Sequence, residues 1–262
     1  MISITSAQLS AWLAAFFFPF ARILALVASA PILGNKQIPA HVKVGLAMIL
    51  TIIIAPTLDA APAIDPASAI GLFVLMQQIL VGLAMGFVMR LIFTGVEMAG
   101  DLGGLQMGLG FASFYDPQNA TYSPVIAQFL GIIAALAFLG LNGHLYMLSA
   151  LVESFHVFPV STGVPAASAM NIVLHWGGSI FAYALQLSLP LIAALMLTNL
   201  ALGILTRSAP QLNIFAIGFP ITLTVGFATL MLTLPYIAPL MENFAQAGQE
   251  TMLRFAQALG QH

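Results

Sequence analysis

Cysteine is absent from this sequence, which excludes disulfide bonds, thiolate metal sites and a thiol nucleophile. Charge is scarce as well: only 5% of the 262 residues are Asp, Glu, Lys or Arg, whereas a soluble domain carries about 25%. The formal net charge of −2 is too small to indicate a nucleic-acid partner or a polybasic membrane anchor. Hydrophobic residues, in contrast, make up 61% of the chain, and the mean hydropathy is +1.04. A normal water-exposed surface cannot be made from this composition, so the sequence predicts an integral membrane protein or a subunit buried in a hydrophobic assembly.

Long apolar segments account for most of the chain. They are residues 11–33, 42–58, 69–93, 125–152, 172–206 and 212–241. A transmembrane helix needs about 20 apolar residues, so most of these segments are long enough and only segment 42–58 is marginal. We expect the last two to be kinked or broken, because they contain Pro190, Pro220 and Pro235. The sequence therefore predicts an all-α fold of membrane-class helical hairpins with kinked or broken helices.

Polar residues and glycines gather in one stretch, from Glu97 to Pro124. Glu97 and Asp101 are four residues apart, so on a helix they would share one face, where unpaired like charges repel. One interpretation is a proton or ion site that also uses Arg90, which would make the chain a secondary transporter. The other is a helix end outside the apolar layer, with both carboxylates hydrated or paired with a partner subunit. We favour the second, because a charge at the bilayer centre costs about 3 kcal/mol.

Glycines and aromatic residues make up much of the rest of this stretch. Gly100 and Gly104, with Gly103 beside them, would form a flat strip on a helix where another backbone approaches closely. Each glycine also weakens a helix by about 1 kcal/mol relative to alanine, so we expect neighbouring helices to hold this one in place. An aromatic loop follows, since Asp116-Pro117 dictates a turn. Irregular backbone at membrane depth is tolerated only within protein or beside a water-filled cavity. The loop therefore either caps the surface or lies in a pore, and the residues alone leave both open.

Signatures of enzymes are missing from the sequence. It contains no Gly-x-Ser-x-Gly motif and no phosphate-binding loop. Glu153-x-x-His156 is only half of a di-iron motif. We therefore predict a protein without catalytic activity, and expect neither a cofactor nor a metal.

Four stretches together resemble one known family. They are ARILALVASAPILGNKQIPAHVK at 21–43, GVEMAGDLGGLQMGLGFASFYDPQ at 95–118, GHLYMLSALVESFHVFPV at 143–160 and LGILTRSAPQLNIFAIGFPI at 202–221. In order and spacing they are similar to the flagellar biosynthetic protein FliR family, the R component of the type III secretion export gate. Related virulence-system proteins share the RSAPQLN core but tend to carry a lysine soon after the following proline. No lysine follows Pro220 here, so the resemblance favours the flagellar branch.

This resemblance implies a non-enzymatic subunit of a protein-conducting pore that secretes unfolded flagellar proteins. Residues 1–170 would form a P-component-like helical half that includes a pore-plug loop at about 106–122. Residues 171–262 would form a Q-component-like hairpin half with an amphipathic C-terminal tail. With the P and Q components, the chain would assemble into a helical, cone-shaped, hetero-oligomeric pore.

The same resemblance implies further partners and a location. The expected partners are the B and A export-apparatus membrane proteins, basal-body ring and rod proteins, exported flagellar proteins and lipid, but no nucleic acid. The expected location is the bacterial inner membrane within the flagellar basal body, with an extension towards the periplasm.

The candidate site residues fall into three groups. The resemblance implies a plug that contains Gln106, Met107, Gly108, Gly110, Phe111, Phe114, Tyr115, Asp116, Pro117 and Tyr122. Helix packing or a hinge is expected at Gly100, Gly103 and Gly104. Candidate subunit contacts are Arg90, Glu97, Asp101, Arg207, Pro210, Gln211 and Asn213. For Arg207, a helix C-terminus, where the dipole favours a cation, is an equally good interpretation.

Overall fold

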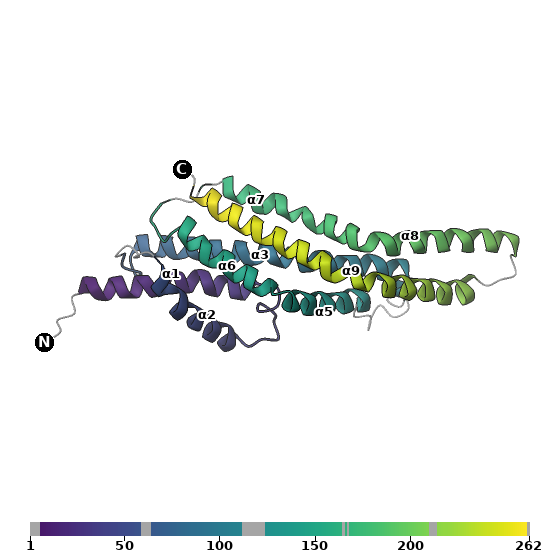
Figure 1. The fold of residues 1–262 in the computed structure, drawn as a ribbon, viewed down its shortest axis with the longest axis horizontal. Helices are drawn as coiled ribbons and strands as arrows, with labels where there is room; N and C mark the ends of the chain where they lie inside the picture. Colours follow the sequence, from purple (N-terminus) through teal and green to yellow (C-terminus); the bar gives the residue numbers. More distant parts are fainter. Residues whose placement is uncertain are drawn as a thin grey trace. The chain divides into compact units, whose positions relative to one another are not determined.

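A computed structural model of the chain describes residues 6–58, 64–111, 124–163, 166, 168–209 and 214–260. Within these ranges every regular element is a helix (Figure 1). The α-helices are α1 (Ser6–Ser29), α2 (Ala40–Ile54), α3 (Ala69–Gln106), α5 (Val125–Gly140), α6 (Gly143–Val157), α7 (Ser168–Gly177), α8 (Ser179–Ser208) and α9 (Ile214–Leu259). Short 3₁₀ turns lie at Ala55–Thr57 and Leu109–Phe111. The prediction of an all-α fold is confirmed for the described part of the chain.

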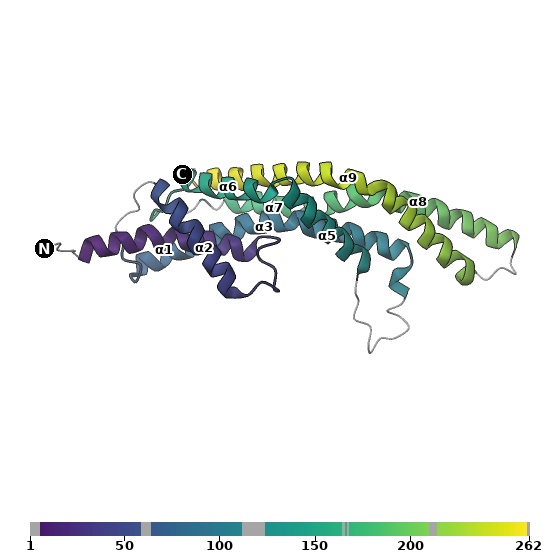
Figure 2. The same cartoon turned by 60° about the horizontal axis from the view of Figure 1, so that its bottom comes forward.

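The helices belong to two compact units. Unit 1 comprises Met1–Leu91, Asn142–Gly177 and Ala245–His262, and unit 2 comprises Ile92–Leu141 and Gly178–Phe244. Helices α3 and α9 contribute residues to both units. In unit 2, α8 and the first part of α9 run side by side as an antiparallel pair (Figure 1 and Figure 2). Each unit therefore combines segments that are far apart in the sequence.

Several helices are long and apolar enough to cross a membrane. Among the described residues these stretches are Ala11–Ser29, Ala40–Thr57, Ala69–Gln106, Ser168–Ser208 and Ala216–Leu259. Large apolar side chains on them are exposed, with Leu197, Met231 and Leu232 at 69%, 75% and 74%. Many exposed apolar side chains on one chain mark contact with lipid or with another protein. The chain is an all-α membrane protein, as its composition predicts.

Helix α9 contradicts one expectation. The prediction of a break at Pro220 and Pro235 is wrong. Helix α9 continues from Ile214 to Leu259, with both prolines and Pro239 inside it. A proline in a helix interior removes one backbone hydrogen bond and costs about 3 kcal/mol, but packing against neighbouring helices compensates for this in membrane proteins. Ile237 and Met241, which lie on either side of Pro239, are 2% and 1% exposed. Tertiary packing therefore keeps the helix continuous.

Two other long segments are interrupted at places that differ from the expected ones. Segment 172–206 is interrupted at Gly178, between α7 and α8, whereas Pro190 lies inside α8. Segment 125–152 is not one helix, because α5 and α6 are separate helices on either side of a break at Asn142. Asn142 has φ 58° and ψ 26°, a left-handed conformation that asparagine tolerates better than most residues. The Asn-Gly pair at this position is a turn signal that the sequence already contains.

In unit 1, two glycines let α3 approach α1 closely. A Cβ atom at Gly82 would collide with the carbonyl oxygen of Arg22, and a Cβ atom at Gly86 would collide with Oγ of Ser29. Small residues that recur every four positions commonly allow such close contact between membrane helices. This approach places the α1 segment around Arg22 directly against α3.

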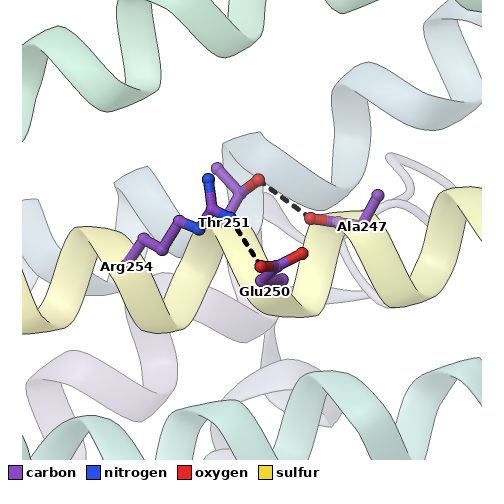
Figure 3. Close-up of polar contacts among 4 residues, drawn as sticks. All are labelled: Ala247, Glu250, Thr251 and Arg254. Atoms are coloured by element: carbon purple, nitrogen blue, oxygen red, sulfur yellow. Dashed lines mark hydrogen bonds and ion pairs between the residues drawn. The ribbon is translucent and has the colours of Figure 1, made fainter.

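The last part of α9 separates apolar from polar side chains. Met252 is fully buried in unit 1. Arg254 and Glu250 form an exposed ion pair with an N···O distance of 2.6 Å (Figure 3). On the same turns, the Thr251 hydroxyl donates to the Ala247 carbonyl oxygen at 2.8 Å (Figure 3). The end of the helix thus presents one face to the core and one to the surroundings.

Candidate functional site: the end of helix α3 and a buried arginine

Helix α3 ends in a defined turn at the start of the stretch expected to form the plug. The Met107 amide donates to the Gly103 carbonyl oxygen at 2.9 Å, and the Gly108 amide donates to the Leu105 carbonyl oxygen at 3.0 Å. Gly108 has φ 86°, a left-handed conformation that glycine adopts without a steric penalty and that commonly ends helices. Gly108 therefore stops α3 and sets the direction in which the chain leaves it.

Met107 fastens this end of α3 to α9 within unit 2. Its side chain is fully buried, whereas Leu105 is 54% exposed and Gln106 is exposed. The Met107 side chain lies so close to Gly226 that a Cβ atom there would be 2.5 Å from its Cγ. The Thr222 hydroxyl donates to the Met107 carbonyl oxygen at 3.2 Å. The helix end is thus held by one apolar and one polar contact.

Three glycines of α3 contact neighbouring helices of unit 2 to different degrees. At Gly100 a Cβ atom would collide with the backbone of Ala127 in α5. At Gly103 it would collide with Cδ2 of Leu191 in α8. Gly104 has room for a methyl group, because the nearest atom would lie 3.7 Å away. The backbone of α5 therefore requires glycine at position 100, whereas position 104 has room for alanine.

The described part of the chain includes only the first residues of the predicted plug. Gln106, Met107, Gly108 and Gly110 are described, and the backbone of Phe111 completes the 3₁₀ turn. Phe114, Tyr115, Asp116, Pro117 and Tyr122 lie outside the described residues. The plug therefore stays a prediction. The structure gives the geometry of only its first residues, at the end of α3.

The charged residues considered for an ion site lie on α3. Arg90 and Glu97 are exposed, and Asp101 is half-buried. Glu97 lies along α5, because a Cβ atom at Gly131 would be 3.5 Å from its Oε1. Each of the three takes part in an interaction. The role of these three residues as subunit contacts, and the alternative of a coupling site, stay predictions.

Arg207 lies exposed in the last turn of α8. A cation at this position interacts favourably with the negative end of the helix dipole. The same exposure leaves the guanidinium accessible to another subunit or to lipid, so the two interpretations are compatible. Pro210, Gln211 and Asn213 lie outside the described residues, and their role as contacts stays a prediction.

A buried arginine in unit 1 was missed in the sequence. Arg22 of α1 has no exposed surface. Its Nε donates to Oε1 of Gln78 in α3 at 2.7 Å, and its Nη2 donates to the Phe158 carbonyl oxygen at 2.9 Å. Its Nη1 donates to the carbonyl and hydroxyl oxygens of Ser154 in α6, at 3.0 and 3.1 Å. The guanidinium also lies over the Phe155 ring, 4.2 Å from its centroid.

These contacts let one side chain join α1, α3 and the C-terminal end of α6. Carbonyl oxygens in the last turn of a helix carry the negative end of the helix dipole, so they suit a buried cation. Within the described ranges Arg22 forms no ion pair, and dipoles and an aromatic ring stabilise its charge instead. The signal for this site was available, because an arginine inside an apolar membrane helix is costly unless it has partners.

Side chains capable of reaction chemistry are dispersed over the described residues. No group of three or more His, Cys, Asp or Glu side chains in these ranges could hold a metal ion. What the described site offers is a set of contacts between helices.

Comparison with known proteins supplies the wider context. The family described as Bacterial export proteins, family 1, matches residues 13–248. The chain is 47% identical over 244 residues to the flagellar biosynthetic protein FliR of Escherichia coli (strain K12), which covers 93% of both chains. It is 45% identical to the FliR of Pectobacterium carotovorum subsp. carotovorum, again over 93% of both. The FliR of Bacillus subtilis (strain 168) is 32% identical, with 94% of this chain and 96% of the relative covered.

Proposed function

This chain belongs to the bacterial export proteins, family 1, and from this membership we propose that it is a structural membrane subunit of the flagellar protein export apparatus. The observation that carries the proposal is the similarity to flagellar biosynthetic proteins over nearly the full length of both chains. The apolar helices support it, because an export gate must be built within a membrane. The chain would carry out no chemical step, and energy for export would be supplied elsewhere.

Complementation tests this proposal. The chain would be expressed in an Escherichia coli strain that lacks its own FliR, with the E. coli protein as positive control and an empty vector as negative control. We expect swimming motility and secretion of flagellar proteins to return. A chain that reaches the membrane and binds the host export proteins without restoring secretion would contradict the proposal.

The finer proposal is that the chain forms part of the protein-conducting pore and that its residues from Gln106 to Tyr122 act as the plug. The geometry at the end of α3 supports it. The helix ends at Gly108 in a left-handed turn, Leu105 and Gln106 are exposed, and Met107 is anchored. A plug needs a rigid starting point, and a segment that leaves a membrane helix at a fixed residue has one.

A deletion tests the plug. Removing Gly110–Tyr122 should leave the complex assembled but leaky to small ions. The leak would be measured as ion conductance of the purified complex in a planar bilayer, at equal amounts of assembled complex. A complex that assembles and stays sealed would contradict the plug and leave the export role standing.

The proposed partners are the P and Q components of the gate, together with the B and A membrane proteins, ring and rod proteins, and lipid. Support comes from the exposed apolar side chains of α8 and α9, which include Leu197 and Met231. We place the assembly in the inner membrane within the basal body, extending towards the periplasm. The native mass of the complex purified through this chain would give the composition, and a homo-oligomer would contradict it.

We also propose that residues 1–170 form the P-like half and residues 171–262 the Q-like half. The antiparallel pair of α8 and the first part of α9 supports a hairpin in the second half (Figure 1). Expression of residues 171–262 with the remaining gate subunits, followed by co-purification, would test whether this half carries its own subunit contacts.

A further inference from the structure

We propose that the middle of α9 is a docking surface for a membrane helix of another protein chain, and that this helix donates side-chain hydrogen bonds to the carbonyl oxygens of Met231 and Pro235. The inference rests on the proposed function in one respect, that the chain works in a complex with other membrane proteins. It goes beyond that function because it assigns the contact to a particular surface and states the chemistry that the docking helix must carry. The surface lies wholly within unit 2.

One face of α9 is apolar and exposed around two of its prolines. Pro235 and Pro239 are both exposed, and Met231 and Tyr236 beside them are 75% and 67% exposed. Positions 231, 235 and 239 are four residues apart, so they follow one another along the same face of the helix. Ile237, on the opposite face, is buried within the chain. The prolines therefore lie on the side of α9 that this chain leaves uncovered.

The two prolines leave two carbonyl groups of this face without their usual helical donor. In an α-helix the amide of residue i+4 donates to the carbonyl oxygen of residue i, and proline has no amide hydrogen. The Met231 carbonyl therefore lacks the bond from position 235, and the Pro235 carbonyl lacks the bond from position 239. The Thr233 hydroxyl, which lies between them in the sequence, donates instead to the Leu230 carbonyl oxygen at 2.9 Å. Two acceptors one turn apart thus lie on the exposed face.

An apolar environment surrounds these acceptors. The sequence from Ile214 to Met241 contains no charged residue, and this part of α9 belongs to a stretch long and apolar enough to cross a membrane. Acyl chains carry no hydrogen-bond donor, so carbonyl groups that face lipid stay unsatisfied, which is costly. Water would satisfy them, but it would also hydrate the large exposed side chains of Met231 and Leu232. A protein helix supplies both an apolar surface and donors.

The chemistry of the surface defines the docking helix. Hydrogen bonds between membrane helices commonly come from hydroxyl and amide side chains. Tyr236 adds an exposed phenol, which can donate or accept, beside the two carbonyl groups. The two acceptors are separated by one helical turn, about 5.4 Å along the axis. We therefore expect an apolar helix that carries Ser, Thr, Asn or Gln at the contact with this face.

A photo-crosslink identifies the occupant. p-Benzoylphenylalanine would replace Tyr236 in the full chain, and the cross-linked peptide would be sequenced by mass spectrometry after irradiation of membranes that contain the complex. We expect a membrane helix of a different protein, with Ser, Thr, Asn or Gln within one turn of the cross-linked residue. Adducts with lipid only, with a second copy of this chain, or with a helix that lacks such a side chain would overturn the inference.

Phe244 provides the matched control position for the crosslink. Its side chain is buried, and its ring lies against that of Tyr183 with a centroid distance of 3.9 Å. The same photoreactive residue at position 244 should therefore react within the chain. An equal yield of adducts with other proteins from positions 236 and 244 would show that the reaction does not report the docking surface, and would count against it.

Pro235→Ala and Pro239→Ala test the two carbonyl groups themselves. Each substitution supplies the missing amide hydrogen, so α9 satisfies its own carbonyl and the docking helix loses an acceptor. The ratio of free chain to complex, measured by native mass spectrometry in detergent, should rise about threefold to tenfold for each, the range expected for hydrogen bonds between membrane helices. The amount of chain in the membrane should not fall, because alanine favours a helix far more than proline does. Thr233→Val is the control, because its hydroxyl bonds within α9, and it should leave the ratio unchanged.

A double-mutant cycle with the cross-linked partner residue completes the test. Replacement of that residue by alanine should weaken the complex as much as the proline variant does, and the two changes together should add little more, because both remove the same contact. Full additivity would overturn the inference.

The outcomes separate this inference from the proposed function. If the parent chain restores secretion while both proline variants assemble as tightly as it does, the inference is overturned and the proposed function stands. If Thr233→Val weakens the complex as much as the proline variants, the effect is not specific to the two carbonyl groups, and the inference is overturned as well. A chain recovered without any other protein would overturn both.

Discussion

Replacement of Arg22 by methionine should lower the thermal unfolding midpoint of the protein by about 6–12 °C, taking 2–4 °C per kcal/mol for a chain of this size. Methionine keeps most of the arginine's volume, so the change isolates the loss of the guanidinium group. The expected loss in free energy of unfolding is about 3 kcal/mol, from the buried acceptors that Arg22 now serves.

The contacts around Arg22 give this magnitude. Without the guanidinium, the Ser154 carbonyl oxygen keeps the Phe158 amide at 3.0 Å, and the Ser154 hydroxyl keeps the Leu151 carbonyl oxygen at 2.6 Å. Gln78 Oε1 and the Phe158 carbonyl oxygen lose the bond that Arg22 supplies, and each unsatisfied buried acceptor costs about 1–3 kcal/mol. Loss of the contact with the Phe155 ring adds about 1–2 kcal/mol. Release of the buried charge offsets part of this sum.

A double-mutant cycle makes the prediction specific. Gln78→Leu alone leaves the Arg22 Nε–H unpaired, and the amide Nε2 of Gln78 is already buried without a partner. In the double variant with Arg22→Met both polar groups are gone, so it should be more stable than the sum of the single effects by about 1–2 kcal/mol. Gln77→Leu is the matched control, because Gln77 bonds to the Gly163 carbonyl oxygen instead, and its effect should add to that of Arg22→Met.

The assay is thermal unfolding of the detergent-purified complex, followed by fluorescence-detected size-exclusion chromatography. The reasoning fails if Arg22→Met stays within about 2 °C of the parent protein, which is about 0.5–1 kcal/mol by the same conversion. It also fails if Gln78→Leu and Gln77→Leu are equally additive with Arg22→Met in their effects on the unfolding midpoint.

Three smaller predictions use the same thermal assay. Gly100→Ala should lower the midpoint, since overpacking against a backbone costs about 1–3 kcal/mol, whereas Gly104→Ala should raise it slightly through helix propensity; equal shifts would show that the close approach at Gly100 is not real. Asn142→Gly should be neutral or stabilising, while Asn142→Val should cost at least about 1–2 kcal/mol because of its left-handed backbone, and a harmless valine would contradict that conformation. Arg254→Ala breaks the exposed ion pair with Glu250 and should lower the free energy of unfolding by less than about 1 kcal/mol. A larger loss would mean that this pair is covered in the assembly.

The position of the helix breaks shows where local signals were sufficient and where they were not. The Asn-Gly pair at Asn142 is a local turn signal, and it coincides with the break between α5 and α6. The prolines of α9 are equally strong local signals, yet the helix continues through Pro220, Pro235 and Pro239. A proline in a helix interior costs about 3 kcal/mol or more, and the packing of neighbouring residues such as Ile237, which is 2% exposed, offsets this cost.

The candidate site divides in the same way. The residues from Gly100 to Gly110 stand out in the sequence because five of these eleven residues are glycine, and the structure places Gly100 and Gly103 in tight contacts. Their partners could not be read from the pattern, because Leu191 and Gly226 lie on helices far along the chain. Arg22 stood out less, as a single cation in an apolar segment, and its partners come from α3 and α6.

The sequence by itself determined the class of this protein. Its scarcity of charge and its long apolar runs predict membrane helices, since a continuous apolar run of about 20 residues spans a bilayer as a helix and a helix satisfies its backbone hydrogen bonds internally. Its motifs identified the family that the comparisons support. Tertiary structure alone decided which side chains meet: Arg22 with the end of α6, Met107 with Gly226, and α9 unbroken through its prolines. The physical reason is that burial and contact energies are summed over residues distant in the chain, whereas propensity and periodicity report only on neighbours.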